Sequence, residues 1–277
     1  TGGYVLFFIK NKKRSEQALL NIIKEAYING VSTRKIEKLA KSMGIENISK
    51  SNVSNITKGL NEKVEEFQNR KLKSTYPVIW VDALYEKIRF GNEILSMAVH
   101  VVCGINETGE REILGLKPML SESCESYKEL VEDLKKRNLE QVGLVVSDAH
   151  SGLKKAVSES FSGSSWQRCK VHFMRNILSK IPNKSKELIG KKLKLIWEQP
   201  NYEEALKYGK DLISMYETKF TGAMETLEDG LEESLQFYNY KKIDSKKISS
   251  TNILERLNRE IRRRTRVVGI FPSQDSY

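Results

Sequence analysis

Two short apolar segments, each ending on an aspartate, constrain the fold of this chain more than any other feature. Residues 77–82 (PVIWVD) and 142–148 (VGLVVSD) have the continuous apolar character of strands that are buried on both faces. Side chains at the ends of such strands project into a crevice of an α/β sheet while the strands hold them rigidly. We therefore expect Asp82 and Asp148 to lie together at the edge of a sheet.

The segments around these two strands predict a mixed sheet. Further strands are expected over residues 95–105, 112–116 and 166–170, with the turn Asn106-Glu107-Thr108-Gly109 between the first two of these. Helices are expected over residues 126–138 and 151–161. The order of three strands, helix, strand, helix and strand favours an antiparallel meander followed by a parallel crossover. The predicted fold class is therefore α/β.

The region before the sheet is predicted to be helical. Ser32 is expected to cap a helix that ends at Gly44 and carries Ile36, Leu39, Ala40 and Met43. A second short helix is expected over residues 50–60 and a third over residues 61–73. The first two form a helix-turn-helix candidate, although residues 46–48 lengthen its turn. An ordinary helical hairpin is the alternative.

Positive charge is concentrated at the other end of the chain. Lysine and arginine number 47 against 36 acidic residues, which gives a net charge of +11 and favours a polyanionic partner such as nucleic acid. Residues 251–266 form a basic helix in which Arg256, Arg259, Arg263 and Arg266 share one face. We expect this face to contact phosphate. The alternative is a solvated helix in which Glu255 and Glu260 pair with Arg259 and Arg263.

Composition also bears on the cellular compartment. No apolar run approaches the roughly 20 residues that a membrane span needs, and no signal peptide is expected at the start. The cysteines, Cys103, Cys124 and Cys169, are too few and odd in number for a disulfide scaffold. These features predict a protein of the reducing cytoplasm that has no membrane partner.

The paired aspartates suggest metal chemistry. A carboxylate beside an apolar strand needs a partner, and Mg²⁺ prefers one or two carboxylates together with phosphate and water. In the alternative reading, Asp148 caps the helix that follows it and Asp82 pairs with an arginine or lysine. Glu255, in the basic helix, is a third carboxylate that could face the sheet edge.

Cys169 and His172 form a Cys-x-x-His motif, which is at most half of a zinc site because no second pair matches it. We expect them to hold a strand end near the crevice, with His172 able to touch phosphate or a catalytic carboxylate. Trp166 and Arg168 suit base stacking and phosphate contact, but a core tryptophan fits equally well. The sequence contains no phosphate-binding loop of an ATPase and no dinucleotide-binding glycine motif.

Several blocks together carry a resemblance to a known family. Residues 252–272, 166–176, 145–153 and 81–85, with the shorter residues 30–35, resemble in order the blocks of the Mutator-type transposases of bacterial insertion sequences. The resemblance extends over almost the whole chain from Lys12. It implies a ribonuclease-H-like catalytic core with an all-helical insertion, preceded by a helix-turn-helix region.

The resemblance assigns roles to individual residues. It implies a DDE triad of Asp82, Asp148 and Glu255, which holds two Mg²⁺ or Mn²⁺ ions, with Trp166 and Cys169 as structural residues near the site. DNA contacts are expected from a larger set: Arg168, His172, Arg175, Arg256, Arg259, Arg262, Arg263 and Arg266. The chain is expected to divide into a helix-turn-helix-like region, a first part of the core, a helical insertion and a final basic helix, over residues 1–73, 74–175, 176–250 and 251–277.

The expected activity is metal-dependent cleavage and strand transfer at the terminal inverted repeats of an insertion sequence. The expected partners are double-stranded DNA, as element ends and as target, and a second copy in a homodimer. The chain departs from the family pattern at residues 1–10 and 241–250, and we expect it to be truncated at both ends. A catalytically silent DNA-binding fragment is therefore the main alternative, and a ribonuclease-H-like nuclease without transposition is a third.

Overall fold

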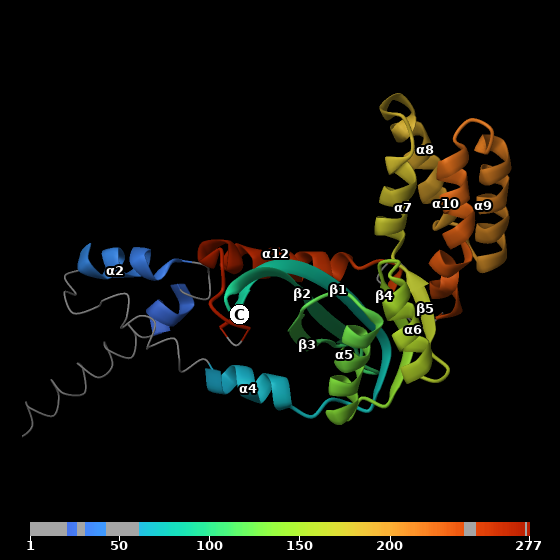
Figure 1. The fold of residues 1–277 in the computed structure, drawn as a ribbon. Coiled ribbons are helices and arrows are strands. Elements are labelled where there is room, and N and C mark those ends of the chain that lie inside the picture. The colour runs from blue at the N-terminus through green and yellow to red at the C-terminus, as the bar shows by residue number, and fades with distance from the viewer. Residues whose placement is uncertain (1–20, 27–30, 43–60, 241–247, 275) are drawn as a thin grey trace, which may run out of the picture. The chain divides into compact units, whose positions relative to one another are not determined.

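The structure, a computed structural model, describes residues 21–26, 31–42, 61–240, 248–274 and 276–277 (Figure 1). It divides the chain into two compact units. One unit comprises Thr1–Arg70, Lys87–Leu95 and Leu257–Tyr277, and the other comprises Lys71–Glu86 and Ser96–Arg256. The expected four-part division of the chain stays a prediction.

A five-stranded mixed sheet lies mostly in the second unit, and the hairpin between its first two strands, Lys87–Leu95, belongs to the first unit. The strands of the sheet are β1 (Thr75–Phe90), β2 (Glu93–Ile105), β3 (Arg111–Met119), β4 (Gln141–Ser147) and β5 (Ser165–Arg168), in the order β3-β2-β1-β4-β5. β2 and β3 are antiparallel, whereas β4 runs parallel to both β1 and β5. The predicted meander and parallel crossover are confirmed, and so is the turn at Asn106, whose side-chain oxygen accepts from the N–H groups of Thr108 and Glu110.

β1 is longer than the sequence predicts. The strand was expected to end at Asp82, but it continues to Phe90, so Asp82 lies inside the strand. Leu84 and Ile88 are buried while Tyr85 is exposed, which shows that the second half is amphipathic. The prediction stopped where the apolar run stopped, because charged residues break that run. The strand turns at Gly91, whose φ of 60° is accessible to glycine without steric cost.

Two helices cover one face of the sheet. α5 (Cys124–Lys136) and α6 (Ser151–Ser160) lie against each other and against the strands, as Figure 1 shows. α5 begins where Ser123 accepts from the Ser126 N–H group at 3.1 Å. Its apolar face meets α6 and the strands in one cluster, which includes Tyr76, Val145, Leu130, Leu134, Leu153 and Val157. This core holds β1 and β4 side by side.

A run of helices follows the last strand. These are α7 (Lys170–Ser179), α8 (Asn183–Ile196), α9 (Tyr202–Tyr216), α10 (Thr221–Gly230) and the 3₁₀ helix η1 (Glu232–Asn239). η1 packs on β5 through Gln167, which donates to the Ser234 carbonyl at 2.7 Å and accepts from the Phe237 N–H group at 2.9 Å. The chain then reaches α12 (Asn252–Val268), the predicted basic helix.

The first unit contains the described N-terminal helices. α2 (Thr33–Ser42) begins at Ser32, whose hydroxyl accepts from the Lys35 N–H group, so the predicted cap is confirmed. Ile36 and Ala40 are buried, but Leu39, expected on the same face, is 52% exposed. The expected second helix of the helix-turn-helix, together with Met43 and Gly44, lies outside the described residues. α4 (Asn61–Asn69) occupies the place of the third predicted helix and ends earlier than expected.

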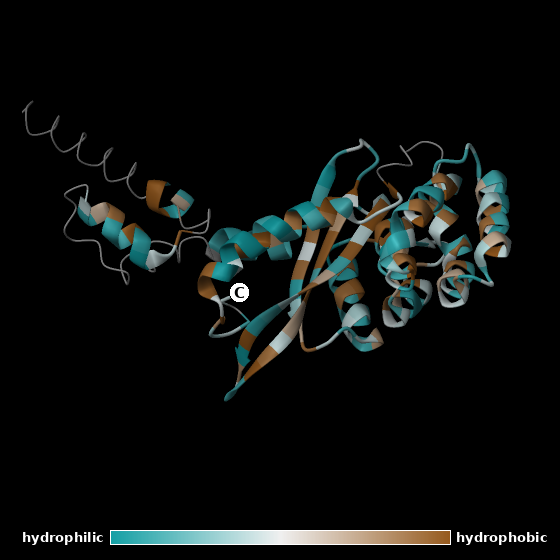
Figure 2. Ribbon diagram, turned by 90° about the horizontal axis from the view of Figure 1, so that it is seen from above, coloured by the Kyte–Doolittle hydropathy of each residue, from teal (hydrophilic) through white to brown (hydrophobic). Residues whose placement is uncertain are grey.

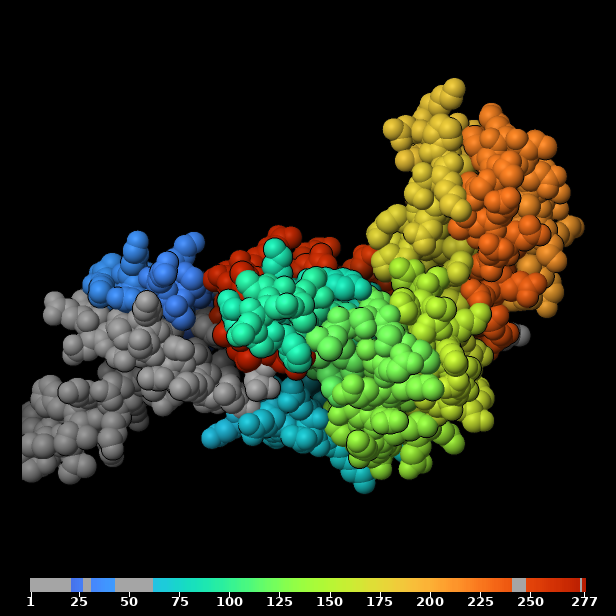
Figure 3. Space-filling view, in the orientation of Figure 1, coloured from blue at the N-terminus to red at the C-terminus, as the bar shows by residue number. Residues whose placement is uncertain are grey.

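The same unit joins the β1–β2 hairpin to the end of the chain. Figure 3 shows the C-terminal residues in red beside this teal hairpin. The Arg89 N–H group donates to the Phe271 carbonyl at 2.8 Å, and the Phe271 N–H group donates to the Lys87 carbonyl at 2.9 Å. The chain after α12 therefore pairs with the outer half of β1.

Two further features were predicted from composition. None of the helices in the described ranges is long and apolar enough to cross a lipid bilayer. Cys103, Cys124 and Cys169 are free thiols, and Cys103 and Cys169 are buried. The expectation that the cysteines do not form a disulfide scaffold is confirmed.

We predict that Leu130→Ala destabilises the protein far more than Leu188→Ala. Leu130 lies on the buried face of α5 and is 2% exposed, whereas Leu188 lies on α8 and is 56% exposed. The core substitution leaves a cavity and should lower the free energy of unfolding by about 2–5 kcal/mol. The matched surface substitution should change it by no more than about 0.5 kcal/mol. Urea denaturation of both variants measures this, and equal losses would contradict the described core.

Candidate active site

Asp82 and Asp148 lie on neighbouring parallel strands. In the register of β1 and β4, Trp80 pairs with Val146, so two residues further along Asp82 is level with Asp148. The Asp82 side chain is half-buried, Asp148 is exposed, and the two carboxylates interact electrostatically. The structure therefore brings together the two aspartates that the sequence places at strand ends, although only Asp148 directly follows its strand.

Asp148 does not cap the helix that follows. The N-cap of α6 is His150, which makes no side-chain capping bond. The Asp148 carboxylate instead accepts from the N–H group of Ala149 at 2.7 Å, and its carbonyl accepts from the His150 N–H group at 2.9 Å. These bonds fix the turn after β4 and leave the carboxylate at the surface. The capping alternative raised by the sequence is therefore wrong.

Asp82 sits in a setting that disfavours its charge. Burial raises the pKa of Asp82 from 3.8 to about 6, and the charge of His172 opposes this rise. The carboxylates of Asp148 and Glu122 raise the Asp82 pKa further. A desolvated carboxylate among like charges is stabilised by any cation that reaches it. This edge of the sheet is therefore suited to positive charge.

His172 is the residue that links the three predicted carboxylates. It lies in the first turn of α7, and its Nε2 is 3.8 Å from the Glu255 Oε1. The side-chain interaction with Cys169 raises the pKa of His172 to about 9. Burial opposes that rise, and the charges of Asp148 and Asp82 add to it. His172 therefore interacts electrostatically with Asp82 and Asp148 and lies near Glu255.

Glu255 reaches this place from the first turn of α12. Leu254 beside it is fully buried and anchors the helix, while the Glu255 side chain is 37% exposed. The Glu255 Oε1 is also 3.7 Å from the Arg175 Nη2, one turn along α7 from His172. Glu255 does not pair with Arg259, as the solvated-helix alternative required. It faces α7, where His172 and Arg175 lie.

The donor set fits a hard divalent cation in type. Carboxylate oxygens are the ligands that Mg²⁺ prefers, and the desolvated Asp82 with Asp148 at its side supplies two of them. Within the described ranges, however, no three acidic, histidine or cysteine side chains lie close enough together to hold an ion as they stand. Glu255 is paired with His172 and Arg175 instead.

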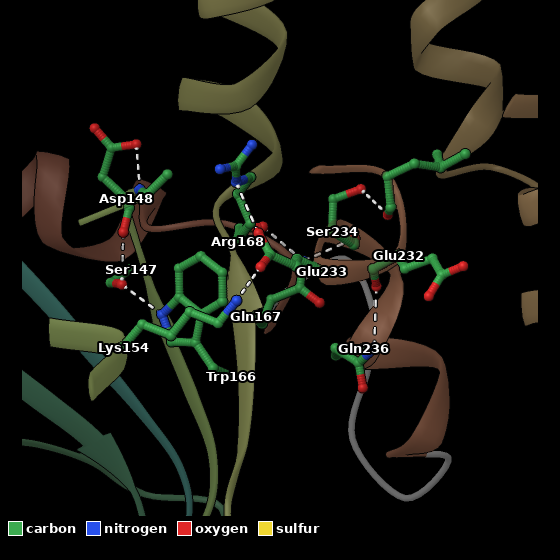
Figure 4. Close-up of polar contacts among 12 residues, drawn as sticks. Ser147, Asp148, Lys154, Trp166, Gln167, Arg168, Glu232, Glu233, Ser234 and Gln236 are labelled. Atoms are coloured by element: carbon green, nitrogen blue, oxygen red, sulfur yellow. Dashed lines mark hydrogen bonds and ion pairs between the residues drawn. The ribbon is translucent and has the colours of Figure 1, made fainter. Parts of the chain in front are cut away.

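The segment after β4 and β5 is fastened by the polar contacts in Figure 4. The Trp166 Nε1 donates to the Ser147 Oγ at 2.9 Å, and that hydroxyl donates to the Asp148 carbonyl at 2.8 Å. The Arg168 Nε lies 3.4 Å from the Glu233 Oε2. The Arg168 guanidinium also lies over the Phe173 ring. These contacts favour structural roles for Trp166 and Arg168. DNA contact by Arg168 stays a prediction.

The arginines of α12 are directed to solvent. Most of the helix is hydrophilic in Figure 2, and an exposed set carries its charge: Arg256, Arg259, Arg262, Arg263 and Arg266. Ile253 and Leu257 are half-buried and Leu254 is buried, so these apolar side chains face the protein. Glu260 pairs with Arg263 at 3.0 Å, as the solvated-helix alternative expected. An exposed ion pair of this kind contributes little and leaves the surface strongly positive.

Comparison with known proteins identifies the family. The sequence profile described as "Transposase, Mutator family" matches residues 1–277. The chain belongs to the Mutator family of transposases. The resemblance carried by the sequence blocks is confirmed.

Curated members of the Mutator family match along most of the chain. The transposase for insertion sequence element IS256 in transposon Tn4001 of Staphylococcus aureus is 40% identical over 267 residues, which cover 95% of this chain and 68% of that protein. The ISRM5 transposase of Rhizobium meliloti is 35% identical over 276 residues, covering 100% and 69%. A solved structure, the Drosophila P element transposase strand transfer complex, covers 88% of this chain at 12% identity, and its TM-score of 0.37 is too low to assign a shared fold.

Within this transposase, sequence reasoning missed Glu122. Its carboxylate accepts from the Tyr127 hydroxyl at 2.8 Å, and a hydrogen bond with Glu122 raises the pKa of Tyr85. Glu122 also contributes to the raised pKa of Asp82. No motif marks Glu122, because it lies in a polar turn before α5. Tyr85 is the residue that could have drawn attention to Glu122, because it is an exposed aromatic residue three positions after Asp82 in β1.

We predict that Gly230→Ala destabilises this transposase, whereas Gly222→Ala on the same helix does not. A Cβ at position 230 would overlap the Arg168 guanidinium and lie 2.7 Å from the Phe173 Cε2. At position 222 the nearest atom is the Lys180 Cδ at 3.8 Å. Gly230→Ala should lower the free energy of unfolding by about 1–3 kcal/mol, while Gly222→Ala should raise it by about 0.4–1 kcal/mol. Thermal unfolding compares them, and a stable Gly230→Ala variant would mean that Arg168 is not held here.

Proposed function

We propose that this chain is the catalytic part of an insertion-sequence transposase that cleaves the element's terminal inverted repeats and joins the freed ends to target DNA. Membership of the transposase family supports the general activity. The observation that carries the chemical proposal is that His172, 3.8 Å from Glu255, also interacts electrostatically with Asp82 and Asp148. Three carboxylates from distant parts of the chain repel one another, and bound cations would offset that repulsion.

In the proposed mechanism the three carboxylates are metal ligands. Two Mg²⁺ or Mn²⁺ ions, when bound there, would activate a water or DNA 3′-hydroxyl for in-line attack and stabilise the leaving oxygen. Asp82 and Asp148 are held on two paired strands, so their spacing is rigid. Glu255 comes from a helix, and its ion pairs within the described part of the chain are long, at 3.7 and 3.8 Å, so it can give them up. Arg175 and His172 are then available to a phosphate.

The fold is consistent with a ribonuclease-H-like core. A mixed five-stranded sheet with an antiparallel meander, then parallel strands with helices between them, supports this proposal. On this view α7 to η1 form the helical insertion between Asp148 and Glu255. The N-terminal region, with the capped helix α2, is proposed as the helix-turn-helix that reads the terminal repeats. A homodimer on chromosomal or plasmid DNA in the bacterial cytoplasm completes the proposal.

We propose double-stranded DNA as the partner of the arginine face. Arg256, Arg259 and Arg266 are exposed on one helix with Arg262 and Arg263, and the chain carries a net charge of +11. Such density on one helix is repulsive unless a polyanion neutralises it. Phosphate contacts of this kind hold DNA in place without selecting its sequence. Selection of the repeat ends is therefore assigned to the N-terminal region.

We predict that Asp82→Asn, Asp148→Asn and Glu255→Gln each abolish metal-dependent cleavage while DNA binding remains. Each change removes a proposed metal ligand and one negative charge, so attraction to DNA is not weakened. The loss should exceed about a hundredfold, which is the upper range for residues that merely support a metal ligand. The assay is nicking of a supercoiled plasmid that carries the terminal repeats, with Mn²⁺ or Mg²⁺.

Glu260→Gln is the matched control for Glu255→Gln. It lies on the same helix, it is exposed, and it pairs only with Arg263 among the contacts described. It should cleave like the unaltered chain. Cleavage that persists in one of the three variants would remove that residue from the triad. Binding without cleavage by the unaltered chain would favour the silent DNA-binding alternative.

We predict that replacing both Arg259 and Arg263 with glutamine weakens DNA binding and reduces its salt dependence. Each phosphate contact contributes about 0.9 to the slope of log affinity against log salt, so the double variant should lose about 1.8. Lys207→Gln with Lys210→Gln, two exposed cations on α9, is the charge-matched control. Fluorescence anisotropy over a salt series measures the slopes. If both double variants changed the slope equally, the effect would come from net charge and not from α12.

A further inference from the structure

Cys169 occupies a position between the two halves of the proposed site. It is fully buried and is the residue on which α7 begins. Its N–H group donates to the Ser147 carbonyl at 2.7 Å. Ser147 is itself 1% exposed and directly precedes Asp148. The main chain of Cys169 is therefore fixed to the strand that presents Asp148.

The sulfur of Cys169 is turned to the start of α12. It accepts from the N–H group of Thr251 at 3.3 Å, and it lies 3.3 Å from the Thr251 Oγ1. Thr251 is fully buried. A second hydrogen bond, from the Lys170 N–H group to the Ser249 carbonyl at 3.1 Å, runs alongside. Two neighbouring residues of the β5–α7 junction thus hold the segment that leads into α12.

Thr251 in turn holds the first turn of α12. Its carbonyl accepts from the N–H groups of Leu254 at 2.8 Å and Glu255 at 3.1 Å. A continuous path of hydrogen bonds therefore runs from Ser147, next to Asp148, through Cys169 and Thr251 to Glu255. Every residue between the two carboxylates on this path is buried, so water does not compete for these bonds.

Other roles for Cys169 fit the contacts less well. A zinc site would need ligands beyond Cys169 and His172, and the other neighbour that bonds the Cys169 sulfur is Thr251, which is not a typical zinc ligand. A nucleophile would need an exposed sulfur, whereas this one is enclosed. Burial alone would raise the pKa of Cys169, but hydrogen bonds with His172 and Thr251 outweigh it and lower the pKa. The sulfur therefore acts as a hydrogen-bond acceptor for its neighbours.

We propose that Cys169 and Thr251 are positioning residues that set the place of Glu255 relative to Asp148. The proposal rests on the proposed function, because it matters to catalysis only if both carboxylates bind the same metal centre. Residues that orient metal ligands typically affect metal affinity or activity by about tenfold to a hundredfold. Loss of the link should therefore weaken metal use without changing how the chain holds DNA.

The test compares Cys169→Ala with Cys103→Ala, which removes another buried thiol from the same sheet-bearing unit. We expect Cys169→Ala to raise the Mn²⁺ concentration for half-maximal plasmid nicking by about tenfold or more. Excess Mn²⁺ should restore part of the rate, and the affinity for DNA should be unchanged. Cys103→Ala should keep the Mn²⁺ dependence of the unaltered chain. The same Mn²⁺ dependence in both cysteine variants would overturn the proposal.

A second pair of variants guards against simple misfolding of Cys169→Ala. Thr251→Val has nearly the shape of threonine but loses the hydroxyl contact to sulfur, whereas Thr251→Ser keeps both contacts. We expect the valine variant to show the raised Mn²⁺ requirement and the serine variant to recover most of the lost function. Equal behaviour of the valine and serine variants would count against the role of the Thr251 hydroxyl and overturn that part of the proposal.

Amide hydrogen exchange tests the link without any metal or DNA. The Thr251 N–H group loses its acceptor in Cys169→Ala, so the peptide over residues 249–256 should exchange faster than in Cys103→Ala. If the unaltered chain does not cleave with Mn²⁺ but this difference appears, the proposed function fails and the link stands. If the chain cleaves but neither exchange nor Mn²⁺ dependence distinguishes the two variants, the positioning role of Cys169 is disproved and the proposed function stands.

Discussion

The arrangement of this site depends on the electrostatic repulsion among its carboxylates. Asp82 and Asp148 are level with each other on paired strands, and burial already disfavours the charge on Asp82. Glu255 adds a third carboxylate. The imidazole of His172, whose pKa is raised to about 9, interacts with all three and offsets part of their repulsion. His172 and Arg175 thus place positive charge beside the proposed metal ligands.

The helix α12 carries both a proposed metal ligand and a row of exposed arginines. Its first turn is buried on one side and supplies Glu255, while the following turns expose arginines to solvent. On the proposed function, this one helix would supply both a metal ligand and the arginines that contact phosphate. Leu254 and Thr251 are fully buried and hold the first turn of α12 in place.

The sequence predicted the sheet well, because its signals are local. Apolar runs located β4 and the first half of β1, and helical spacing located α5 and α6. The second half of β1 was missed because its alternating pattern contains charged residues. The two-residue turn Gly91-Asn92 is a hairpin signal that the interpretation did not use. The pairing of Asp82 with Asp148 followed from strand order. Glu122, the Arg168–Glu233 pair and the exposure of Leu39 depend on tertiary contacts that no local pattern encodes.

The long interval between Asp148 and Glu255 makes those tertiary contacts decisive. Closing a long loop costs only slightly more entropy than closing a short one, but it gives the ends no particular orientation. Orientation must come from contacts at the points where the loop leaves and returns. Gln167 fastens η1 to β5, and the sulfur of Cys169 fastens Thr251 to the start of α7. Both contacts lie within a few residues of β5, so this short strand determines where the helical segment begins and where it returns to the sheet. The Trp-Gln-Arg-Cys sequence at residues 166–169 therefore carries more of the site's geometry than its four-residue strand would indicate.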